Sequence, residues 1–239
     1  MTLEALDEAR RRRIYLFRHA ETSYVDREGN AVPDSRAVPL TTRGCEQAVQ
    51  ASLWLADVPF DRVVCSGLLR TRETVERLIV GRQLAIEEKP ALEEIRPGHA
   101  VLESDFDMLR DVAYAGTRAA VPDASLLGGE RYVAFRERVI GALEELVRDS
   151  EWNTLLIVCH GGTNAMILCW VLGAGLETFG RIEQDPCCVN VIDLDIDPDT
   201  GAIVRKFLRA ANVTSYDPVK AATGLTAWET IAKSLLGGG

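Results

Sequence analysis

The sequence lacks any apolar run long enough to cross a bilayer, and residues 1–13 form no apolar signal-peptide core. It also lacks an excess of basic charge, because 36 Asp and Glu residues outnumber 27 Lys and Arg residues and give a net charge of −9. Nucleic acids usually bind a basic face, so neither a nucleic-acid partner nor a membrane partner is expected. We expect a cytoplasmic location.

The sequence also has few residues at the spacings that are typical of metal ligands. The six cysteines include no CxxC pair, and Cys65 and Cys159 lie inside apolar strand-like runs. This favours buried free thiols over disulfides or a zinc site. The aspartates that alternate over residues 193–199 loosely resemble a calcium loop, but their flanks predict a strand with a solvated acidic face and no metal.

What the chain does contain is an alternation of β-prone and helix-like runs, which predicts an α/β domain with a mostly parallel sheet. The length of 239 residues fits a single domain over residues 1–239. Strands are expected at residues 13–17, 62–65, 85–87, 155–159, 189–194 and 203–208. Helices are expected after Thr41, at 69–80, from 128, up to 172 and at 227–236.

Three segments should lie outside this regular pattern. Residues 1–12 are expected to be flexible, and the basic block at residues 10–13 is expected to be a solvated lead-in to the first strand. Residues 99–128 predict a small helical cap insertion over the sheet edge. Residues 237–239 are also expected to be flexible. His99, near the start of the insertion, is expected in a surface loop rather than in contact with a substrate.

Three of the expected strands end in groups that can bind an anion. The first delivers Arg18 and His19. The second delivers Ser66 and, one helical turn later, Arg70. The most apolar strand delivers His160, followed by two glycines. Ligands bind at the carboxyl ends of parallel strands, so these groups should converge on one pocket that suits a phosphoryl group.

An imidazole in such a pocket suggests phosphoryl transfer, because a neutral histidine is a competent nucleophile toward phosphorus. Guanidinium groups can neutralise the transferring oxygens, so neither a metal nor a cofactor is expected. A proton donor for the leaving oxygen is also needed, and Glu93 and Glu94 lie in a loop at a comparable depth. Thr22 and Ser66 could donate to the phosphate or only cap or turn the chain.

The chain resembles the histidine phosphatase superfamily, in the branch with cofactor-dependent phosphoglycerate mutases and small-molecule phosphatases. Separated motifs carry the resemblance over residues 13–216. They are Arg18-His19-Ala20-Glu21-Thr22, then Leu40-Thr41 with Gly44, Gln47 and Ala48, then Ser66 with Leu69, Arg70 and Thr74, then Leu92, Glu94, Ile95 and Gly98, then Gly128-Gly129-Glu130 with Phe135, Arg138 and Val139, then His160-Gly161-Gly162, and finally Asn212.

The resemblance implies a phosphoglycerate-mutase-like fold, a three-layer α/β sandwich. It implies that His19 attacks phosphorus and becomes a phosphohistidine. It further implies that Glu94 protonates the leaving group and then activates water. The groups expected to hold the phosphoryl oxygens are Arg18, Arg70, His160, Thr22 and Gly161.

Departures from the family pattern favour a phosphatase over a mutase. Val25 stands where mutases often carry Asn, and Arg131 stands where Ser or Thr commonly follows Gly-Gly-Glu. Ala20 replaces a usual Gly, as is common among the phosphatases. The paired arginines that hold phosphoglycerate are not found, because Arg110 and Arg118 are isolated.

We therefore expect a metal-independent phosphatase that acts on a small phosphorylated metabolite. One alternative is a phosphoglycerate mutase. The other is a non-catalytic member that binds a phospho-ligand or a protein, but such a member would be expected to have lost His19, Arg70 or Glu94. The sequence makes no prediction of the oligomeric state.

Overall fold

The computed structural model describes residues 10–24, 32, 34–98, 112–149, 151–222 and 224–235. Its centre is a six-stranded sheet in the order β3-β2-β4-β1-β5-β6. The strands are β1 (Arg10–Arg18), β2 (Arg62–Cys65), β3 (Ile86–Glu88), β4 (Thr154–Cys159), β5 (Val189–Ile196) and β6 (Ile203–Val213). β1 to β4 run parallel, and β5 and β6 are antiparallel additions at one edge. The prediction of a mostly parallel sheet is confirmed.

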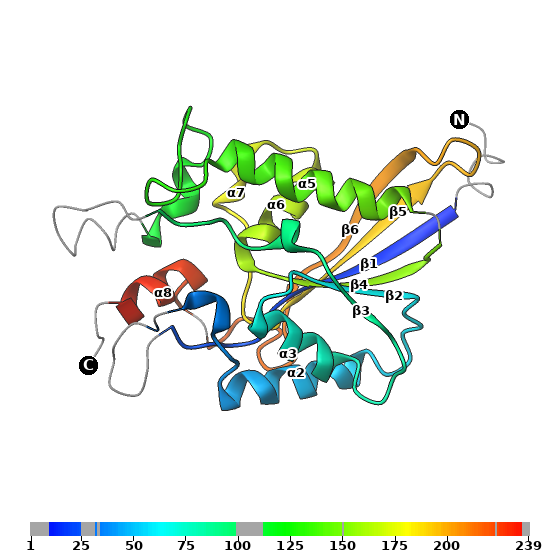
Figure 1. Cartoon of the computed structure of the whole chain (residues 1–239), viewed down its shortest axis with the longest axis horizontal. Coiled ribbons are helices and arrows are strands. Elements are labelled where there is room, and N and C mark those ends of the chain that lie inside the picture. Colours follow the sequence, from blue (N-terminus) through cyan, green and yellow to red (C-terminus); the bar gives the residue numbers. More distant parts are fainter. Residues whose placement is uncertain are drawn as a thin grey trace.

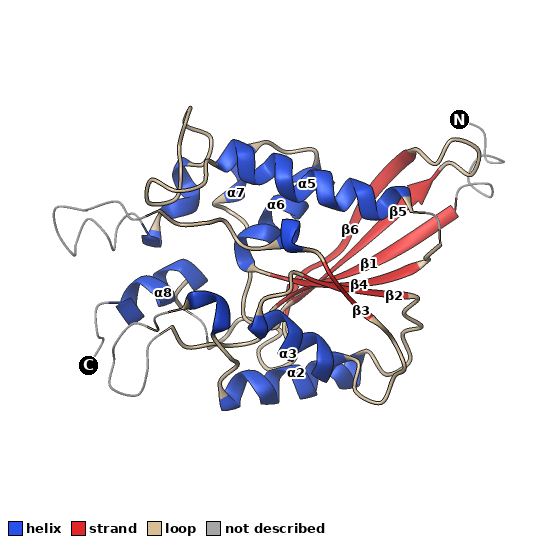
Figure 2. Ribbon diagram, in the orientation of Figure 1, coloured by secondary structure: helices blue, strands red, loops and turns tan. Residues whose placement is uncertain are grey.

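Helices cover both faces of this sheet (Figure 1). α2 (Thr42–Trp54) and α3 (Leu69–Leu78) lie on one face, and α5 (Tyr132–Arg148) and α6 (Gly161–Leu172) on the other (Figure 2). Because side chains alternate along a strand, β1 feeds both cores: Ile14 and Leu16 join the core under α5 and α6, and Phe17 joins the core with α2 and α3. The predicted three-layer α/β sandwich is confirmed.

Shorter elements join these layers. They are α7 (Leu176–Phe179), α8 (Ala227–Leu235) and the 3-10 turns η1 (Ser35–Ala37), η2 (Pro90–Leu92) and η3 (Ala115–Arg118). α8 lies beyond the carboxyl ends of the parallel strands, between the two helical layers (Figure 1). It therefore stands in front of the edge at which a ligand is expected.

The basic block at residues 10–13 is not a solvated lead-in, because β1 begins at its first residue. Arg11 and Arg13 lie directly opposite Asp195 and Asp193 on β5, at 2.8 and 2.7 Å. Those two carboxylates are 1% and 0% exposed, so the prediction of a solvated acidic face is wrong as well. Opposite charges across an antiparallel pair stabilise the pairing. Residues 1–9 and 236–239 lie outside the described residues.

The apolar residues after Thr41 predict a buried helix face that includes Leu53 and Trp54, and this prediction is wrong in part. Thr41 caps the helix as its hydroxyl oxygen accepts from the Gly44 N–H at 2.9 Å. However, Leu53 and Trp54 are 72% and 50% exposed, and the buried side consists of smaller residues and Gln47. The cause is a close backbone approach, because a Cβ atom at Gly44 would clash with the carbonyl oxygen of Glu21.

The predicted cap insertion falls partly outside the described residues, as do His99, Arg110 and Val25. Within residues 112–128, the first two residues are helical, η3 follows, and turns make up most of the remainder. Gly98 and Gly129 pack backbone to backbone, with no room for a Cβ atom on either. Their contact fixes the loop after η2 against the loop that precedes α5.

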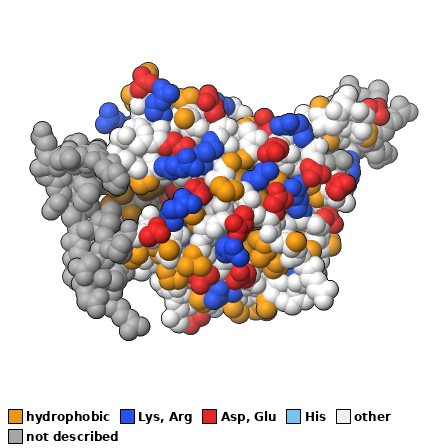
Figure 3. Space-filling view, in the orientation of Figure 1, with side chains coloured by type: hydrophobic (Ala, Val, Ile, Leu, Met, Phe, Trp, Pro, Cys, Tyr) orange, Lys and Arg blue, Asp and Glu red, His pale blue; other side chains and the backbone are white. Residues whose placement is uncertain are grey.

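The remaining surface shows acidic and basic side chains interspersed over the face drawn in Figure 3. None of the described helices is both long and apolar enough to span a membrane. All six cysteines are free thiols, and all but Cys45 are buried, as the sequence predicts.

Candidate active site

The strand ends bring the predicted catalytic residues together. A cavity of about 320 Å³ opens beneath α8 at the carboxyl ends of β1 and β4. The predicted site residues that line it are Arg18, His19, Arg70, Glu94, His160 and Gly161. Thr22 lies apart from this group and lines an adjoining cavity of about 450 Å³, which shares Arg18 and His19.

His19 is held in one orientation by the backbone. Its Nδ1 atom lies 2.8 Å from the carbonyl oxygen of Ala20. A carbonyl can only accept, so Nδ1 carries the proton and the neutral ring keeps its lone pair on Nε2. Burial, and then the charges of Arg70 and Arg18, lower the pKa of His19 well below its usual value. The ring is therefore neutral at physiological pH, with the lone pair of Nε2 free.

His160 is oriented by a chain of hydroxyl groups. Its Nε2 lies 2.8 Å from the Ser66 hydroxyl, which lies 3.1 Å from the Thr71 hydroxyl. Thr71 donates to the carbonyl oxygen of Leu68, so Ser66 donates to Thr71 and accepts from His160 Nε2. The Nδ1 atom of His160 is then unprotonated in the neutral ring and donates to a ligand only when His160 is protonated. The centroids of the His160 and His19 rings lie 5.3 Å apart. Ser66 thus orients His160 and does not line the cavity.

Two arginines in the cavity wall have donors to spare. Arg18 and Arg70 are 8% and 5% exposed, and each donates one bond to a backbone carbonyl, of Gln184 and Ser35 respectively. Among the described residues, the Nε atoms of both arginines and Nδ1 of His160 are buried without a hydrogen-bond partner. Buried donors without partners are rare and costly. The two arginine Nε–H groups at one cavity are therefore suited to an anion, and Nδ1 of His160 becomes a third donor when that ring is protonated.

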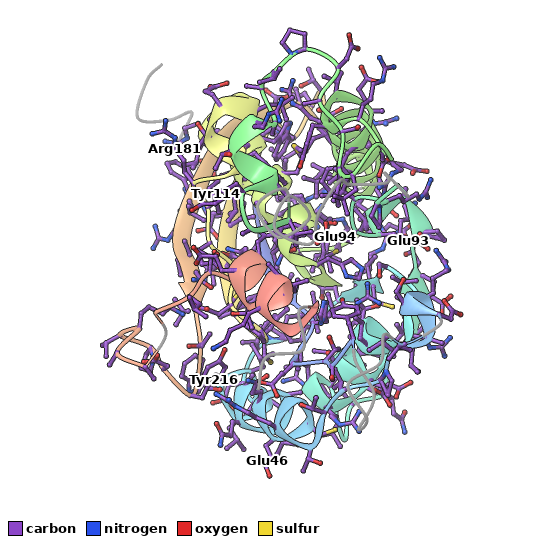
Figure 4. The ribbon with its side chains drawn as sticks, turned by 90° about the vertical axis from the view of Figure 1, so that its left-hand side faces the viewer. Glu46, Glu93, Glu94, Tyr114, Arg181 and Tyr216 are labelled. Atoms are coloured by element: carbon purple, nitrogen blue, oxygen red, sulfur yellow. The ribbon has the colours of Figure 1, made fainter. Side chains whose placement is uncertain are left out.

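Glu94 and its neighbour Glu93 occupy different surroundings (Figure 4). The Glu94 carboxylate accepts from the N–H groups of Ile95 and Gly162 at 2.9 and 2.8 Å and lines the cavity. Its burial raises its pKa above the usual range. Glu93 instead forms a two-point pair with Arg36, and this pair lowers the pKa of Glu93. Only Glu94 combines access to the cavity with a raised pKa.

The comparisons with known proteins agree with this geometry. A model of the histidine phosphatase superfamily, branch 1, matches residues 14–207. The chain belongs to this superfamily. The predictions of the family and of a phosphatase-type enzyme are thereby confirmed.

Individual members of the superfamily match over most of the chain. The adenosylcobalamin/alpha-ribazole phosphatase of Escherichia coli K12 is 29% identical over 186 residues, which are 77% of this chain and 90% of that protein. A Proteus mirabilis protein named "Probable phosphoglycerate mutase GpmB" is 28% identical and covers 77% of this chain and 86% of its own length. The crystal structure of the alpha-ribazole phosphatase from Shigella flexneri matches with a TM-score of 0.66 and 28% identity, over 84% of this chain and 96% of that one. The expected phosphoglycerate-mutase-like fold is confirmed.

Arg138 of this histidine phosphatase has a positioning role that the sequence did not reveal. Its Nη1 atom donates to the carbonyl oxygens of Ala91 and Glu93, and its Nε and Nη2 atoms bind Glu130. The side chain therefore clamps the loop that carries Glu94. The sequence signal was its place in a family motif, but the carbonyl groups that it binds lie 45 and 47 residues away.

The other motif residues of the superfamily position the loop after His19. The Thr74 hydroxyl accepts from the Ala20 N–H at 3.0 Å and donates to the Arg70 carbonyl at 2.7 Å. Gln47 accepts from the Glu21 N–H at 3.0 Å. Thr22 forms a β-bridge with Leu40. These contacts give Leu40, Gln47 and Thr74 a positioning role around the loop after His19.

Proposed function

We propose that the protein is a metal-independent phosphatase that hydrolyses a small phosphorylated metabolite through a phosphohistidine on His19. In the first step His19 Nε2 forms a bond to phosphorus as the bond from phosphorus to the alcohol oxygen breaks. Glu94 gives its proton to that oxygen. In the second step water attacks phosphorus, its proton passes to the Glu94 carboxylate, and the bond to His19 breaks.

The observation that carries this proposal is the pairing of a neutral imidazole with a carboxyl of raised pKa in one cavity. The nucleophile needs a free lone pair, and the acid must still hold its proton when the substrate arrives. The incoming phosphate dianion would raise the pKa of Glu94 further by like charge.

The charge of the phosphoryl group would be met by the chain's own donors. Arg18 and Arg70 offer unpaired Nε–H groups, and a protonated His160 adds Nδ1–H, so the phosphate would draw a proton onto His160. Gly161 begins α6, whose N-terminus favours negative charge. In the described part of the chain, no three His, Cys, Asp or Glu side chains are grouped as a metal site.

Hydrolysis is favoured over isomerisation by the cations of the cavity. Among its described lining residues, the only arginines are the two that face the phosphate, and none of these residues is a lysine. Arg118 lines a different pocket, on η3. A phosphoglycerate would need a further cation for its carboxylate. The relatives include a named phosphatase and a protein named as a probable mutase, and the cations of the cavity favour the phosphatase reaction.

The test is a screen of phosphorylated metabolites and p-nitrophenyl phosphate for phosphate release, with and without EDTA. Release that survives EDTA and is absent from His19→Ala is expected. Loss of activity that magnesium or zinc restores would overturn the metal-independent mechanism. Phosphoglycerate interconversion that outpaces phosphate release from the same substrate would favour a mutase. No turnover of any ester, together with retained phosphate binding, would favour a non-catalytic binding protein.

A further inference from the structure

α8 forms a roof over the candidate active site and is anchored at its first turn. Thr226 and Glu229 cap each other, with the Glu229 N–H donating to the Thr226 hydroxyl and the Thr226 N–H to the Glu229 carboxylate. The Ala227 N–H donates to the Glu183 carboxylate at 2.8 Å, which ties the helix to the loop before β5. Trp228 and Ile231 on α8 line the cavity.

The roof divides the space in front of the strands into two compartments that share His19. The first is the cavity with Glu94, and the second is the adjoining cavity with Thr22. Ala227 and Ile231 of α8 line both compartments. Figure 4 shows Glu94 on one side of α8 and Tyr216, which lines the second compartment, on the other.

The position of Glu94 assigns the leaving group to the first compartment. A general acid must lie within hydrogen-bond reach of the oxygen that it protonates. Glu94 lines the first compartment and is not among the residues that line the second. The alcohol part of the substrate therefore leaves through the compartment under Trp228.

That compartment has an apolar wall. Beyond the catalytic groups it is formed largely by Ile95, Val112, Leu126, Leu127, Trp228 and Ile231, and Ser35 and Tyr24 supply polar atoms. The second compartment contains the charged side chains of Glu21, Arg43 and Asp185. Beyond the catalytic groups, the described lining of the first compartment offers no charged side chain, so a sugar or a carboxylate there would lose its water without gaining a charged partner. A ring would instead bury apolar surface.

We propose that the substrate is a phosphate monoester of an alcohol that carries an apolar, ring-sized group, and that Trp228 and Leu127 determine this specificity. The inference rests on the proposed function and adds the class of the alcohol. The volume of about 320 Å³ lies in the range of small-ligand pockets and accommodates a single ring system beside the phosphoryl group.

The test compares esters whose alcohols have similar acidity, so that leaving-group chemistry does not differ. 2-Phenylethyl phosphate, ethyl phosphate and glycerol 3-phosphate serve this purpose. We expect kcat/KM for the phenylethyl ester to exceed that for ethyl phosphate by roughly 30-fold, since burial of a phenyl-sized group supplies an effect of this order. Trp228→Ala should reduce this ratio to below about fivefold, because the phenyl group then loses the apolar surface that it buries.

Two further variants keep the test decisive if Trp228→Ala loosens α8. Leu127 lines the same cavity from a different segment and has a φ of 50°, a backbone conformation that Asn tolerates better than Leu. Leu127→Asn should therefore fold. This single substitution should lower the ratio of kcat/KM for the phenylethyl ester to kcat/KM for ethyl phosphate. Trp54→Ala removes a half-exposed tryptophan on α2, outside the cavity, and should leave the ratio unchanged.

The outcomes separate this inference from the proposed function. If phosphate is released with no preference for the phenylethyl ester, the inference is overturned but the proposed phosphatase activity is not. The same holds if the preference exists and both Trp228→Ala and Leu127→Asn leave it intact. A preference for glycerol 3-phosphate has the same meaning. Absence of phosphate release from every ester, p-nitrophenyl phosphate included, overturns both.

Discussion

The two ends of β1 use arginine in opposite ways. At the start of the strand, Arg11 and Arg13 each meet a buried carboxylate on β5, and all four charges are paired. At its end, Arg18 is buried beside Arg70, and among the described residues each donates only to a backbone carbonyl. Desolvating a cation is costly unless it is paired. The paired end therefore stabilises the sheet, and the unpaired end keeps charge available for a ligand.

The largest effect should come from His19, at the unpaired end. His19→Ala should abolish phosphate release from both alkyl and aryl esters, a loss of more than about 10⁴-fold, because no phosphoenzyme can form. Arg11→Ala, at the paired end of the same strand, is the control and should retain activity. Acid-labile phosphate on the protein should be present in the control and absent from His19→Ala. Activity in His19→Ala would remove the nucleophile from the mechanism.

Adjacent carboxylates provide the next test. Glu94→Gln should lower kcat/KM for alkyl phosphates by about 10²–10⁴-fold, since an amide cannot give up the proton. p-Nitrophenyl phosphate, whose leaving group needs little protonation, should be affected much less. The matched variant Glu93→Gln alters the pair with Arg36 instead and should show no such selectivity. If the selective loss appears in Glu93→Gln, the acid is Glu93.

Thermal unfolding should distinguish the two ends directly. Arg13→Met leaves the buried Asp193 carboxylate with only a longer contact to Arg209, and should lower the free energy of unfolding by about 1–3 kcal/mol. Arg18→Met removes an unpaired buried cation and should cost less. Inorganic phosphate should raise the Tm of the wild type and of Arg13→Met but not of Arg18→Met. If inorganic phosphate raised the Tm of all three proteins equally, Arg18 would not be part of the phosphate site.

A final effect, of a size similar to that of Arg13→Met, should be a pH dependence of stability. The pKa values of His19 and His160 are lowered in the folded protein, so below about pH 6.5 the unfolded chain binds more protons than the folded one. The free energy of unfolding should therefore decrease as the pH is lowered from about 6.5 toward the folded-state pKa values. The decrease should be about 1.4 kcal/mol per pH unit for each ring.

Two details sharpen this measurement. The raised pKa of Glu94 acts in the opposite direction, but only close to its own titration. Urea unfolding at pH 7.0, 6.0 and 5.5 should show a slope that His160→Gln reduces and Arg11→Ala does not. The same slope in wild type and His160→Gln would mean that His160 is not held neutral.

The sequence predicted local features well and distant partners poorly. The ends of β1, β2 and β4 were predictable because each apolar run stops at a polar residue, and the convergence of Arg18, Arg70 and His160 follows from parallel pairing alone. The ion pairs of Arg11 and Arg13 were not predictable, because their partners lie 184 and 180 residues away in the sequence and the register of β5 is a tertiary property.

Other features depend on contacts that no pattern encodes. The buried face of α2 is set by the close approach of Gly44 to residue 21, which overrides the apolar periodicity of the helix. A terminal helix at residues 227–236 was predicted, and the structure describes it as α8. Its position over the candidate site depends on the anchor that Glu183 provides.

The backbone contact between Gly98 and Gly129 has a consequence for altering the enzyme by directed evolution. It makes the loop with Glu94 and Ile95 and the loop with Leu126 and Leu127 one mechanical unit. A library that reshapes either loop to admit a bulkier alcohol would therefore displace the acid as well. α8 is free of this coupling, because it enters the site as a separate segment near the end of the chain. Substitutions in α8 are therefore the better way to change the substrate range, because they leave the loop with Glu94 in place.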